Sequence, residues 1–593
     1  MLYEGEKMIN ESIYGFPRPD FKRKKWKSLN GQWEFDFDWD ESVRIEEGLN
    51  KSYEHEITVP FCYQSNRSGI GIQKDCPVVW YRKTFILEKE NDTVLLKFGA
   101  VDYKAQIWVN GMFIGSHEGG YSSFEFDITE ELICGENHIV VRVEDGNEAD
   151  KPRGKQTWTG ENFGCWYTPV TGIWQSVWLE FVPQVYLQRI KITPDLTSLS
   201  ALCELFLSSR KKVECAIHSY MESNGQIIDF GRQYFYCDEG YGKAVIAFRD
   251  FDLRRDAIYW SPEHPNLISV DIELSTDTDK DQVSTYFGMR SISVQGNKIL
   301  LNQEEYFQRL VLDQGYWEDT ILTPPSQEAI IKDISLIKQM GFNGVRKHQK
   351  IEDPLFYYYA DRMGLLVWGE LPSSYEYNDN MICRSAEEMM RFLERDFNHP
   401  SIVVWVPVNE SWGVRDILEN VAQQNYTKGM LYLIKAMDKT RLVSANDGWE
   451  QVEGTDICTI HDYIYTQKSM GKYENVKEIL NGSVETRMIF ACNNRYQGQP
   501  IVLSEYGGIA FDDEQGGSWG YLEKVGSEEE FMARLAPVTA EIIHSRKFAG
   551  FCYTQLTDVM QEVNGLLKID HTPKVSVERL KSVFGMKFYQ YEE

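Results

Sequence analysis

The chain has 593 residues, of which 42% are hydrophobic and 26% charged, and its formal net charge is −28. This composition is typical of a soluble globular protein, and the length exceeds what one hydrophobic core supports, so we expect three or four domains. The acidic charge, with no basic run to offset it, argues against nucleic acid and anionic membranes as general partners. Aromatic residues form 13% of the chain. They favour a carbohydrate ligand, although large β-rich proteins also use them as core.

The cysteines and the N-terminus bear on the cellular compartment. The 11 cysteines are scattered and lack metal-ligand spacing, which indicates buried free thiols in a reducing compartment. The first residues lack the apolar segment of a signal peptide, and no apolar run of about 18 residues follows. We therefore expect a cytoplasmic protein, although a secreted chain trimmed of its signal peptide would look the same.

Residues 1–183 alternate polar and apolar positions between turns rich in glycine, asparagine and aspartate. Residues 33–38 have the two-residue period of a half-buried strand, and Asn-Gly at 110–111 is a strong hairpin signal. Since no long helical pattern occurs, an all-β sandwich is predicted. Residues 184–290 continue with shorter strands that match an immunoglobulin-like sandwich, at 188–192, 201–205 and 267–272.

From residue 291 onward, helical patterns alternate with short buried strands. The clearest helix-then-strand units are 327–340 with 342–346, 353–363 with 365–368, and 386–397 with 402–408. Gly341 is expected to end the first of these helices. Repetition of such units over about 300 residues predicts a (β/α)8 barrel at 291–593.

Barrels of this kind place their chemistry where the strands end. Polar residues stand at the predicted ends: Arg346, His348, Glu370, Asn409, Glu410, Asn446, Asp447, His461, Asp462, Glu505 and Gln555. Glu410 and Glu505 each follow an apolar strand and have aromatic neighbours. Two such glutamates suit glycosidic bond cleavage, in which an acid protonates the leaving oxygen and a carboxylate attacks or activates water. Arg346 and Glu370 have a simpler interpretation as an ion pair that ties strands together.

The two glutamate segments, Asn-Glu-Ser-Trp-Gly at 409–413 and Ser-Glu-Tyr-Gly-Gly at 504–508, resemble the catalytic segments of glycoside hydrolase family 2. Further likenesses extend over nearly the whole chain, at 26–33, 81–85, 109–111, 172–177 and 287–290. The resemblance implies a jelly roll at 1–183, an immunoglobulin-like β-sandwich at 184–290 and a catalytic TIM barrel at 291–593. It also implies a retaining exo-β-glycosidase with a covalent glycosyl-enzyme intermediate, in which Glu410 is the acid/base and Glu505 the nucleophile.

Other residues are candidates for contacts with the sugar. Asn409 is expected to hydrogen-bond the sugar 2-hydroxyl, and Tyr463 or Tyr506 to hold the nucleophile. Trp519, in a loop after the nucleophile strand, is expected to close over the sugar, and Trp412 is a stacking candidate. The further substrate-binding candidates are Arg346, His348, Lys350, Trp166, Trp449, Asp462 and Gln555. Lys347 and Lys350 also fit positions that face solvent or helix ends, and Trp368 fits barrel core.

Departures from the family pattern bear on the identity of the sugar. The Arg-His pair expected after the first barrel strand is replaced at 312–316, and Trp166 stands where the family usually has an aspartate. The Asn-x-Lys motif of β-glucuronidases is not matched at 564–568. A neutral-sugar enzyme of β-galactosidase type is therefore the first expectation. The alternatives are a β-hexuronidase, acting on galacturonate or as a non-standard glucuronidase with cations from 346–350, and an α-L-arabinopyranosidase.

Two rival classes remain, a non-catalytic carbohydrate-binding protein and a metal-dependent hydrolase. Intact glutamate motifs argue against the first, and the lack of a His-x-x-x-His or clustered Cys/His motif argues against the second. We expect no cofactor. Some family members carry Na⁺ or Mg²⁺ near the site, but no ligands for an ion can be named here. A carbohydrate is the expected partner, and a homo-oligomer is an expectation from the resemblance alone.

Overall fold

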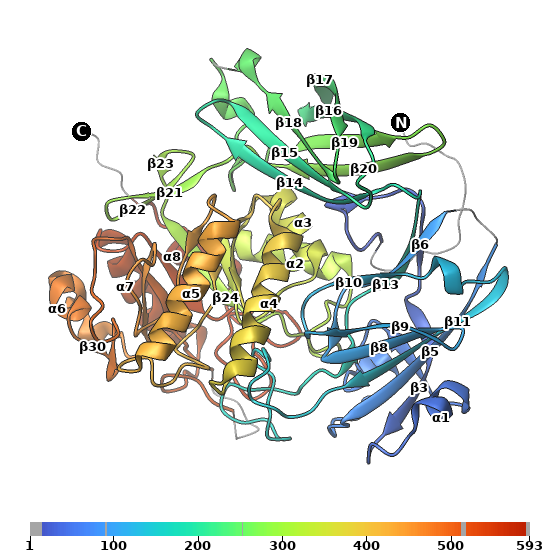
Figure 1. Ribbon diagram of the computed structural model, residues 1–593. Coiled ribbons are helices and arrows are strands. Elements are labelled where there is room, and N and C mark those ends of the chain that lie inside the picture. The colour runs from blue at the N-terminus through green and yellow to red at the C-terminus, as the bar shows by residue number, and fades with distance from the viewer. Residues whose placement is uncertain (1–14, 89–91, 224, 252, 512–517, 589–593) are drawn as a thin grey trace.

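The structure, a computed structural model, describes residues 15–88, 92–223, 225–251, 253–511 and 518–588. Two β-sandwiches pack against a barrel of strands and helices (Figure 1). The first sandwich is blue, the second is green, and the barrel runs from yellow-green to red. The multidomain β plus α/β fold predicted from the sequence is therefore confirmed.

The first sandwich holds an apolar core between two antiparallel sheets. One sheet consists, in order, of β4 (His55–Val59), β3 (Gly31–Asp38), β5 (Val78–Leu87), β11 (Gly135–Glu144), β8 (Lys104–Val109) and β9 (Met112–Glu118). The other consists of β10 (Phe124–Asp127), β6 (Thr93–Phe98), β13 (Val177–Val182) and β2 (Trp26–Ser28). A short pair, β7 (Val101–Asp102) and β12 (Gly172–Ile173), lies beside them. The predicted hairpin forms, since Asn110 (φ 50°) and Gly111 (φ 82°) join β8 to β9.

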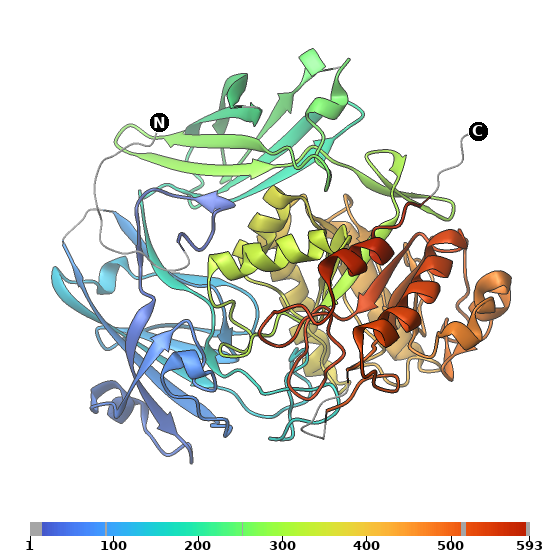
Figure 2. The same cartoon turned by 180° about the vertical axis from the view of Figure 1, so that it is seen from behind.

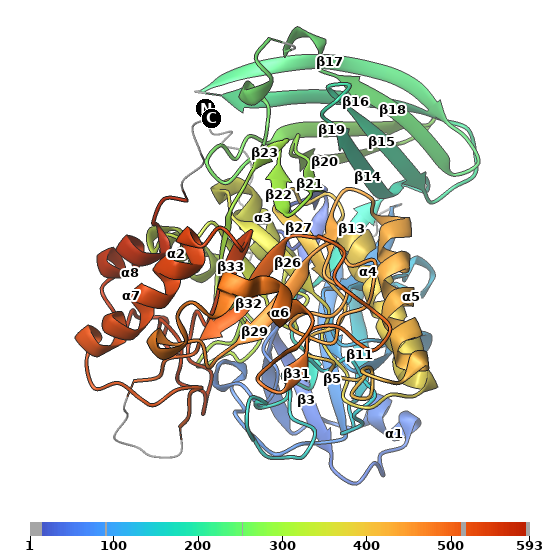
Figure 3. The same cartoon turned by 90° about the vertical axis from the view of Figure 1, so that its left-hand side faces the viewer.

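The second sandwich lies at the top of Figure 3. One sheet consists of β1 (Phe21–Lys22), β20 (Lys280–Phe287), β19 (Ile268–Ser275), β16 (Val213–Ser223) and β17 (Gln226–Cys237). The other consists of β14 (Leu187–Asp195), β15 (Ser200–Leu207) and β18 (Tyr241–Ala247). Because β1 pairs with β20, the N-terminal segment contributes a strand to this sandwich before it enters the jelly roll.

The barrel sheet is parallel and curled, with eight strands in the described part of the chain. In chain order they are β24 (Gln308–Asp313), β25 (Gly344–Lys347), β26 (Leu366–Glu370), β27 (Ile402–Val406), β28 (Leu442–Val443), β29 (Cys458–Asp462), β32 (Ile501–Gly507) and β33 (Gly550–Thr554). The helices around them are α2 (Gln327–Gln339), α3 (Pro354–Met363), α4 (Asp379–Asp396), α5 (Val421–Met437), α6 (Val476–Leu480), α7 (Glu528–His544) and α8 (Val577–Phe584). Residues 444–457, all described, join β28 to β29 without a helix.

Local signals explain where these helices begin and end. Ser326 and Asp353 cap α2 and α3 through their side chains. Gly341, just after α2, has φ +98°, and a Cβ there would lie 2.6 Å from a backbone nitrogen of α8's C-cap, so only glycine fits. The helix predicted at 386–397 is too short, because α4 begins at Asp379 under the Asn378 cap.

The barrel interior is apolar below the strand ends, and Trp368 lies in it as predicted. At the end of the barrel where the strands finish, the jelly-roll loop at 145–171 packs against the barrel. Two backbone hydrogen bonds hold it there, from Arg153 N–H to Ser373 O (3.0 Å) and from Tyr375 N–H to Ala149 O (2.7 Å). Figures 1 and 2 show this blue-green loop passing beneath the barrel helices. The first sandwich thus brings one of its loops onto the barrel.

The state of the cysteines and the apolarity of the helices bear on the compartment expected from the sequence. The 11 cysteines all lie in the described part of the chain and are free thiols, most of them buried, with Cys134, Cys383 and Cys492 exposed. Among the described helices, none is long and apolar enough to cross a lipid bilayer.

Candidate active site

Arg346 lies at the centre of the polar residues at the carboxyl ends of the barrel strands. It is the third residue of β25 and is fully buried. Its guanidinium group contacts Glu370 Oε2 (2.8 Å), Ser504 O (2.9 Å), Asp447 Oδ1 (3.1 Å), Asn409 Oδ1 (2.8 Å), Glu505 Oε1 (2.8 Å) and His348 Nδ1 (3.0 Å). Guanidinium donors are fixed in a planar fork, which suits such a hub. The Arg346–Glu370 ion pair expected from the sequence forms, and the same arginine also holds Glu505.

Glu410 and Glu505 approach each other above this arginine. Glu505 Oε1 accepts from Arg346, and its Oε2 accepts from the hydroxyl group of Tyr463. Glu410 Oε1 accepts from His461 Nδ1 (2.7 Å), and its Oε2 accepts from Trp412 Nε1 (3.2 Å). One oxygen of Glu410 and one of Glu505 lie within 4.8 Å of each other. The two carboxylates therefore face one reaction space, each held by its own donors.

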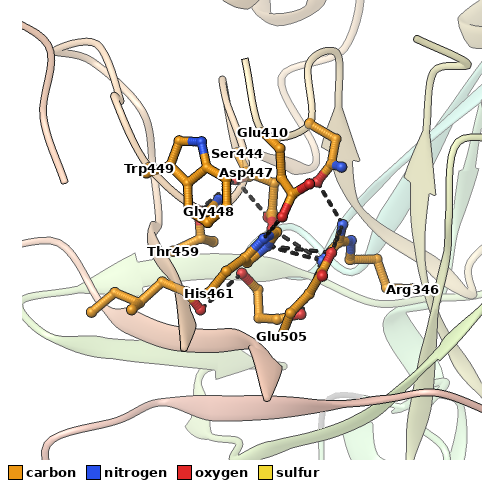
Figure 4. A network of polar contacts seen from close by, with 12 residues as sticks. Arg346, Glu410, Ser444, Asp447, Gly448, Trp449, Thr459, His461 and Glu505 are labelled. Carbon is orange, nitrogen blue, oxygen red and sulfur yellow. Dashed lines mark hydrogen bonds and ion pairs between the residues drawn. The ribbon is translucent and has the colours of Figure 1, made fainter. Parts of the chain in front are cut away.

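His461 lies between the two carboxylates (Figure 4). Its Nε2 is 2.8 Å from Asp447 Oδ1 and 3.5 Å from Glu505 Oε1, while its Nδ1 contacts Glu410. Burial lowers the pKa of His461, but the charge of Glu505 and the bonds to Asp447 and Glu410 outweigh burial and raise it to about 10. The ring is therefore an imidazolium near neutral pH.

The same contact sets the protonation of Glu410. Burial raises the pKa of this carboxyl, but the hydrogen bond and charge of His461 outweigh burial, so the pKa is lowered from its ordinary value. In the free protein Glu410 is thus ionised, and the proton nearest to it is on His461 Nδ1.

The raised pKa of His461 predicts that stability falls as the pH rises above neutrality. An unfolded histidine titrates near pH 6.5, so this stabilisation is complete below that pH and is lost as the pH rises through about 10. We expect the Tm to fall more steeply between pH 7 and pH 10 in the wild type than in His461→Gln, measured by thermal denaturation in a pH series. Equal slopes in the two proteins would contradict the assignment.

The backbone at Glu410 has an uncommon conformation that orients the side chain. Glu410 (φ 50°) and Ser411 (φ 58°) both adopt the left-handed region, which costs a non-glycine residue about 1–3 kcal/mol. Glu410 N–H donates to Asp447 O (2.9 Å), and Ser411 N–H donates to Asn446 Oδ1 (3.1 Å). The loop after β28 thus holds the strained turn that presents Glu410.

Aromatic rings surround the carboxylates. Trp412 makes edge contacts with Trp166 (5.1 Å between ring centroids) and Tyr375 (5.6 Å), and Trp449 lies 5.3 Å from the His461 ring. Near Glu505, the Tyr521 ring stacks on the ring of Tyr463, and the Trp519 ring makes an edge contact with Tyr521. Trp519 Nε1 also donates to Gly164 O in the jelly-roll loop. The glycines at 516–517 of its predicted loop lie outside the described residues.

Family models match all three parts of the chain. The family 2 TIM barrel domain of the glycosyl hydrolases matches residues 323–588, the family 2 sugar binding domain matches 26–181, and a third family 2 model matches 185–290. The chain belongs to glycoside hydrolase family 2. It is therefore a glycoside hydrolase, and a carbohydrate is its substrate.

Individual relatives of this family 2 hydrolase carry several names. A β-glucuronidase of Paenibacillus borealis is 24% identical over 96% of this chain and 98% of its own length. A β-galactosidase of Thermoanaerobacter pseudethanolicus is 24% identical over 81% of this chain and 66% of its own length. The crystal structure of a β-galacturonidase from Eisenbergiella tayi bound to galacturonate superimposes with a TM-score of 0.76 at 19% identity, over 98% of this chain and all of that one. The likeness to the galacturonidase structure, at 19% identity, shows that the two proteins share a fold and nothing more.

Two residues expected in the site of the hydrolase lie elsewhere. Asp462 Oδ2 accepts from Lys472 Nζ (2.7 Å) and Tyr473 Oη (2.6 Å), outside the barrel. Side chains alternate along a strand, so His461 points inward and Asp462 outward. The hydroxyl of Tyr506 contacts Thr539 instead of the nucleophile, which leaves Tyr463 as the partner of Glu505.

The expectations for Lys347 and Lys350 were also wrong, because both are buried. Lys350 Nζ donates to Gly315 O (2.8 Å) and Leu322 O (2.7 Å) and pairs with Glu352 (2.9 Å). An ammonium group has three donors, so none remains for a sugar. Lys347 pairs with Asp313 and Glu352 in the same cluster. These lysines support the barrel mouth from below.

Gln555 belongs to a chain of side-chain hydrogen bonds beside the carboxylates. Its Oε1 accepts from Gln314 Nε2 (2.6 Å), which also contacts Tyr167 Oη (2.9 Å), and Tyr167 donates to Glu562. Gln314 lies in the stretch 312–316, where the resemblance to the family leads one to expect Arg-His.

Sequence reasoning left out several side chains that the structure brings to the site. His461 is one of the predicted strand-end polar residues, but its sequence context does not single it out as a substrate or catalytic candidate. Lys155 and Glu562 lie in irregular loops and have no local signature. The two cations and the glycine at 153–155, just before a tryptophan-containing stretch, are the available signal for Lys155.

Glu410, His461 and Glu505 each offer a ligand atom within 4.8 Å of the others, as a metal site would require. Na⁺ and Mg²⁺ prefer ligand sets made of oxygen alone, whereas this group includes an imidazole. Moreover, Arg346 and the His461 imidazolium already neutralise the two carboxylates. The cluster therefore does not fit the alkali or magnesium ion that some family members carry.

Proposed function

We propose that the protein is a retaining β-glycosidase acting on a terminal sugar, with Glu505 as nucleophile and Glu410 as acid/base. The observation that carries this proposal is the separation of the two carboxylates, whose oxygens approach within 4.8 Å. Retaining enzymes have carboxyl groups about 5–5.5 Å apart, whereas inverting enzymes need about 6.5–9.5 Å to admit a water molecule.

The reaction proceeds in two displacements at the anomeric carbon. First the carboxylate of Glu505 attacks this carbon, the bond to the leaving oxygen breaks, and Glu410 protonates that oxygen. Then Glu410 takes a proton from water, the water oxygen attacks the same carbon, and the ester to Glu505 breaks. Arg346 and Tyr463 donate hydrogen bonds to Glu505 and hold its carboxylate in position for the attack.

The acid step requires a proton on Glu410, although its pKa is lowered in the free protein. His461 Nδ1 is 2.7 Å from Glu410 Oε1 and can pass its proton to that oxygen. Formation of the ester removes the charge of Glu505, which is the largest of the interactions that raise the pKa of His461. His461 is therefore a positioning residue that supplies the proton as Glu505 is consumed.

Asn409 is poised for the sugar 2-hydroxyl. Its Oδ1 accepts from Arg346, which fixes the orientation of the amide, while its Nδ2 is buried without a partner among the described residues. A buried amide donor is costly when unpaired, so a ligand oxygen is its expected partner. Hydrogen bonds to the 2-hydroxyl strengthen in the transition state of glycoside cleavage.

The stereochemistry of hydrolysis tests the proposal. A panel of 4-nitrophenyl glycosides would include β-galactoside, β-glucoside, β-glucuronide, β-galacturonide, β-mannoside and α-L-arabinopyranoside. We expect at least one to be cleaved, with the product anomer of the same configuration as the substrate appearing first by proton NMR. An inverted first product would contradict the roles of Glu410 and Glu505, and a wholly inactive panel would contradict the proposed sugar classes.

A further inference from the structure

Lys155, in the jelly-roll loop, carries a buried ammonium group that makes no ion pair with any described residue. The residue is 6% exposed, and among the described residues its Nζ has one hydrogen-bond partner, Cys165 Sγ at 3.3 Å. Lys347, buried to a similar extent, has carboxylates of Asp313 and Glu352 at 2.8 and 2.6 Å. Burying an ammonium group without a counter-charge costs several kcal/mol, so a ligand anion is the expected partner.

The ammonium group lies within the aromatic wall of the active site. Its Nζ is 5.7 Å from the centre of the Trp166 ring, whose edge contact with Trp412 leads to Glu410. Burial lowers the pKa of Lys155, but the acidic groups around it, first Cys165 and Tyr375 and then Glu410 and Glu562, outweigh burial, and the net pKa is raised. The group is therefore a cation against Trp166, in the aromatic wall that also contacts Glu410 through Trp412.

The loop that carries Lys155 is held firmly. The backbone carbonyl of Lys155 accepts from Tyr167 N–H (2.8 Å). The side chain of the next residue, Gln156, donates from Nε2 to Asp102 (2.8 Å) and to the hydroxyl of Tyr121 (3.0 Å). Gly154 has φ +64°, and a Cβ there would lie 2.3 Å from Gln349 O, so the loop packs against the barrel as closely as glycine allows. A cation fixed in advance loses little entropy when it binds a ligand.

The nearby carboxylates have other partners. Glu562 accepts from the hydroxyl of Tyr167 and from Asn564 Nδ2 (3.0 Å), and burial raises its pKa. Glu410 accepts from His461 and Trp412. Neither carboxylate is within ion-pairing distance of Lys155. We therefore expect an anionic group of the substrate to be the counter-ion of this ammonium group.

We propose that Lys155 binds a carboxylate on the terminal sugar, so that the jelly-roll loop makes the enzyme selective for β-hexuronides. This inference rests on the proposed glycosidase function. It reverses the order of the two sugar classes expected from the sequence, and it places the cation in the first domain rather than at 346–350. A neutral hydroxyl would offset the buried charge less well, because charge-assisted hydrogen bonds are about twice as strong as neutral ones.

Matched acidic and neutral substrates test the role of Lys155. In Lys155→Met we expect kcat/KM for 4-nitrophenyl β-galacturonide or β-glucuronide, whichever the wild type prefers, to fall about 100- to 1,000-fold. The value for the matching neutral galactoside or glucoside should change less than about threefold, so the ratio of the two collapses. Lys155→Arg, which keeps the cation, should retain most of the wild-type ratio.

Arg415→Gln is the matched control, because Arg415 is an exposed cation 5.2 Å from the Trp412 ring, and its removal should leave the ratio unchanged. Equal losses on acidic and neutral substrates in Lys155→Met would mean that Lys155 supports Glu410 or the fold, and would overturn the inference. So would a wild type that prefers the neutral member of each pair.

A binding measurement separates failure of this inference from failure of the proposed function. Calorimetric titration of the wild type and Lys155→Met with D-galacturonate, D-glucuronate and D-galactose needs no turnover. Wild-type binding of a uronate that is lost in the variant would support the carboxylate contact even if every glycoside proved inert. Equal uronate binding by the two proteins would overturn it even if the enzyme is active.

Discussion

Glu505→Gln is expected to lower kcat by about 10⁴-fold or more while the protein stays folded. Glutamine has almost the same shape as glutamate, but its amide cannot form the glycosyl ester. Its Oε1 can still accept from Arg346, and the hydroxyl of Tyr463 can turn to accept from the new amide. Arg346 also keeps its contacts with Glu370 and Asp447, so the hub survives. The measurement is steady-state hydrolysis of the best glycoside of the panel, with circular dichroism and Tm as the check on folding.

Glu410→Gln is the matched variant, because it removes the acid/base and leaves the nucleophile. A nitrophenolate leaves without much help from an acid, so the first displacement should survive in Glu410→Gln but not in Glu505→Gln. Azide, which needs no general base, should therefore restore turnover in Glu410→Gln and yield a glycosyl azide of retained configuration. Near-normal turnover in Glu505→Gln would show that Glu505 is not the nucleophile. Rescue of Glu505→Gln by azide, with none in Glu410→Gln, would show that the two roles are exchanged.

Arg346→Met should have the largest effect on stability, about 3–5 kcal/mol. The side chain is fully buried, and its removal leaves the buried carboxylates of Glu370, Asp447 and Glu505 without their shared cation. Burial already raises the pKa of Glu370 despite the arginine, and loss of the arginine would raise it further. The loss is read from urea denaturation of the whole chain.

Arg579→Met serves as the control for Arg346→Met. Arg579 pairs with Glu528 at 3.0 Å on the surface, with its side chain 40% exposed, and exposed pairs contribute about 0–1 kcal/mol. A loss below about 1 kcal/mol in Arg346→Met, equal to that in the control, would mean that the buried arginine does not hold the strand ends together.

Much of the fold follows from local patterns along the chain. The buried strand at Ile402–Val406 and the helix–strand units beside it were predicted within a few residues, because apolar periodicity and caps act over short distances. The start of α4 was missed because its Asn378 cap precedes a stretch with little apolar signal. Glu410 and Glu505 stand out for a similar local reason, as carboxylates at the ends of apolar strands.

Which polar side chain of a strand end faces the site depends on register. His461 and Asp462 are adjacent, and nothing local to them distinguishes inward from outward. In the structure the pairing of β29 with β32 is irregular between Ile460 and His461, and this irregularity turns His461 toward Glu410 and Glu505. Irregular pairing of this kind re-aims side chains beside active sites, and it arises from contact between strands far apart in sequence.

By itself the sequence determined the family and the order of the three folds, and it singled out the two glutamates as candidates, because periodicity, caps and short motifs depend on neighbouring residues. Only the tertiary structure decided how the pair is held: that Arg346 and His461 join the two carboxylates, that the Lys350 ammonium group donates to barrel carbonyls, and that Lys155 of the jelly-roll loop lies against Trp166. The physical reason is that contacts between distant segments depend on how whole domains pack, and no local pattern records that packing.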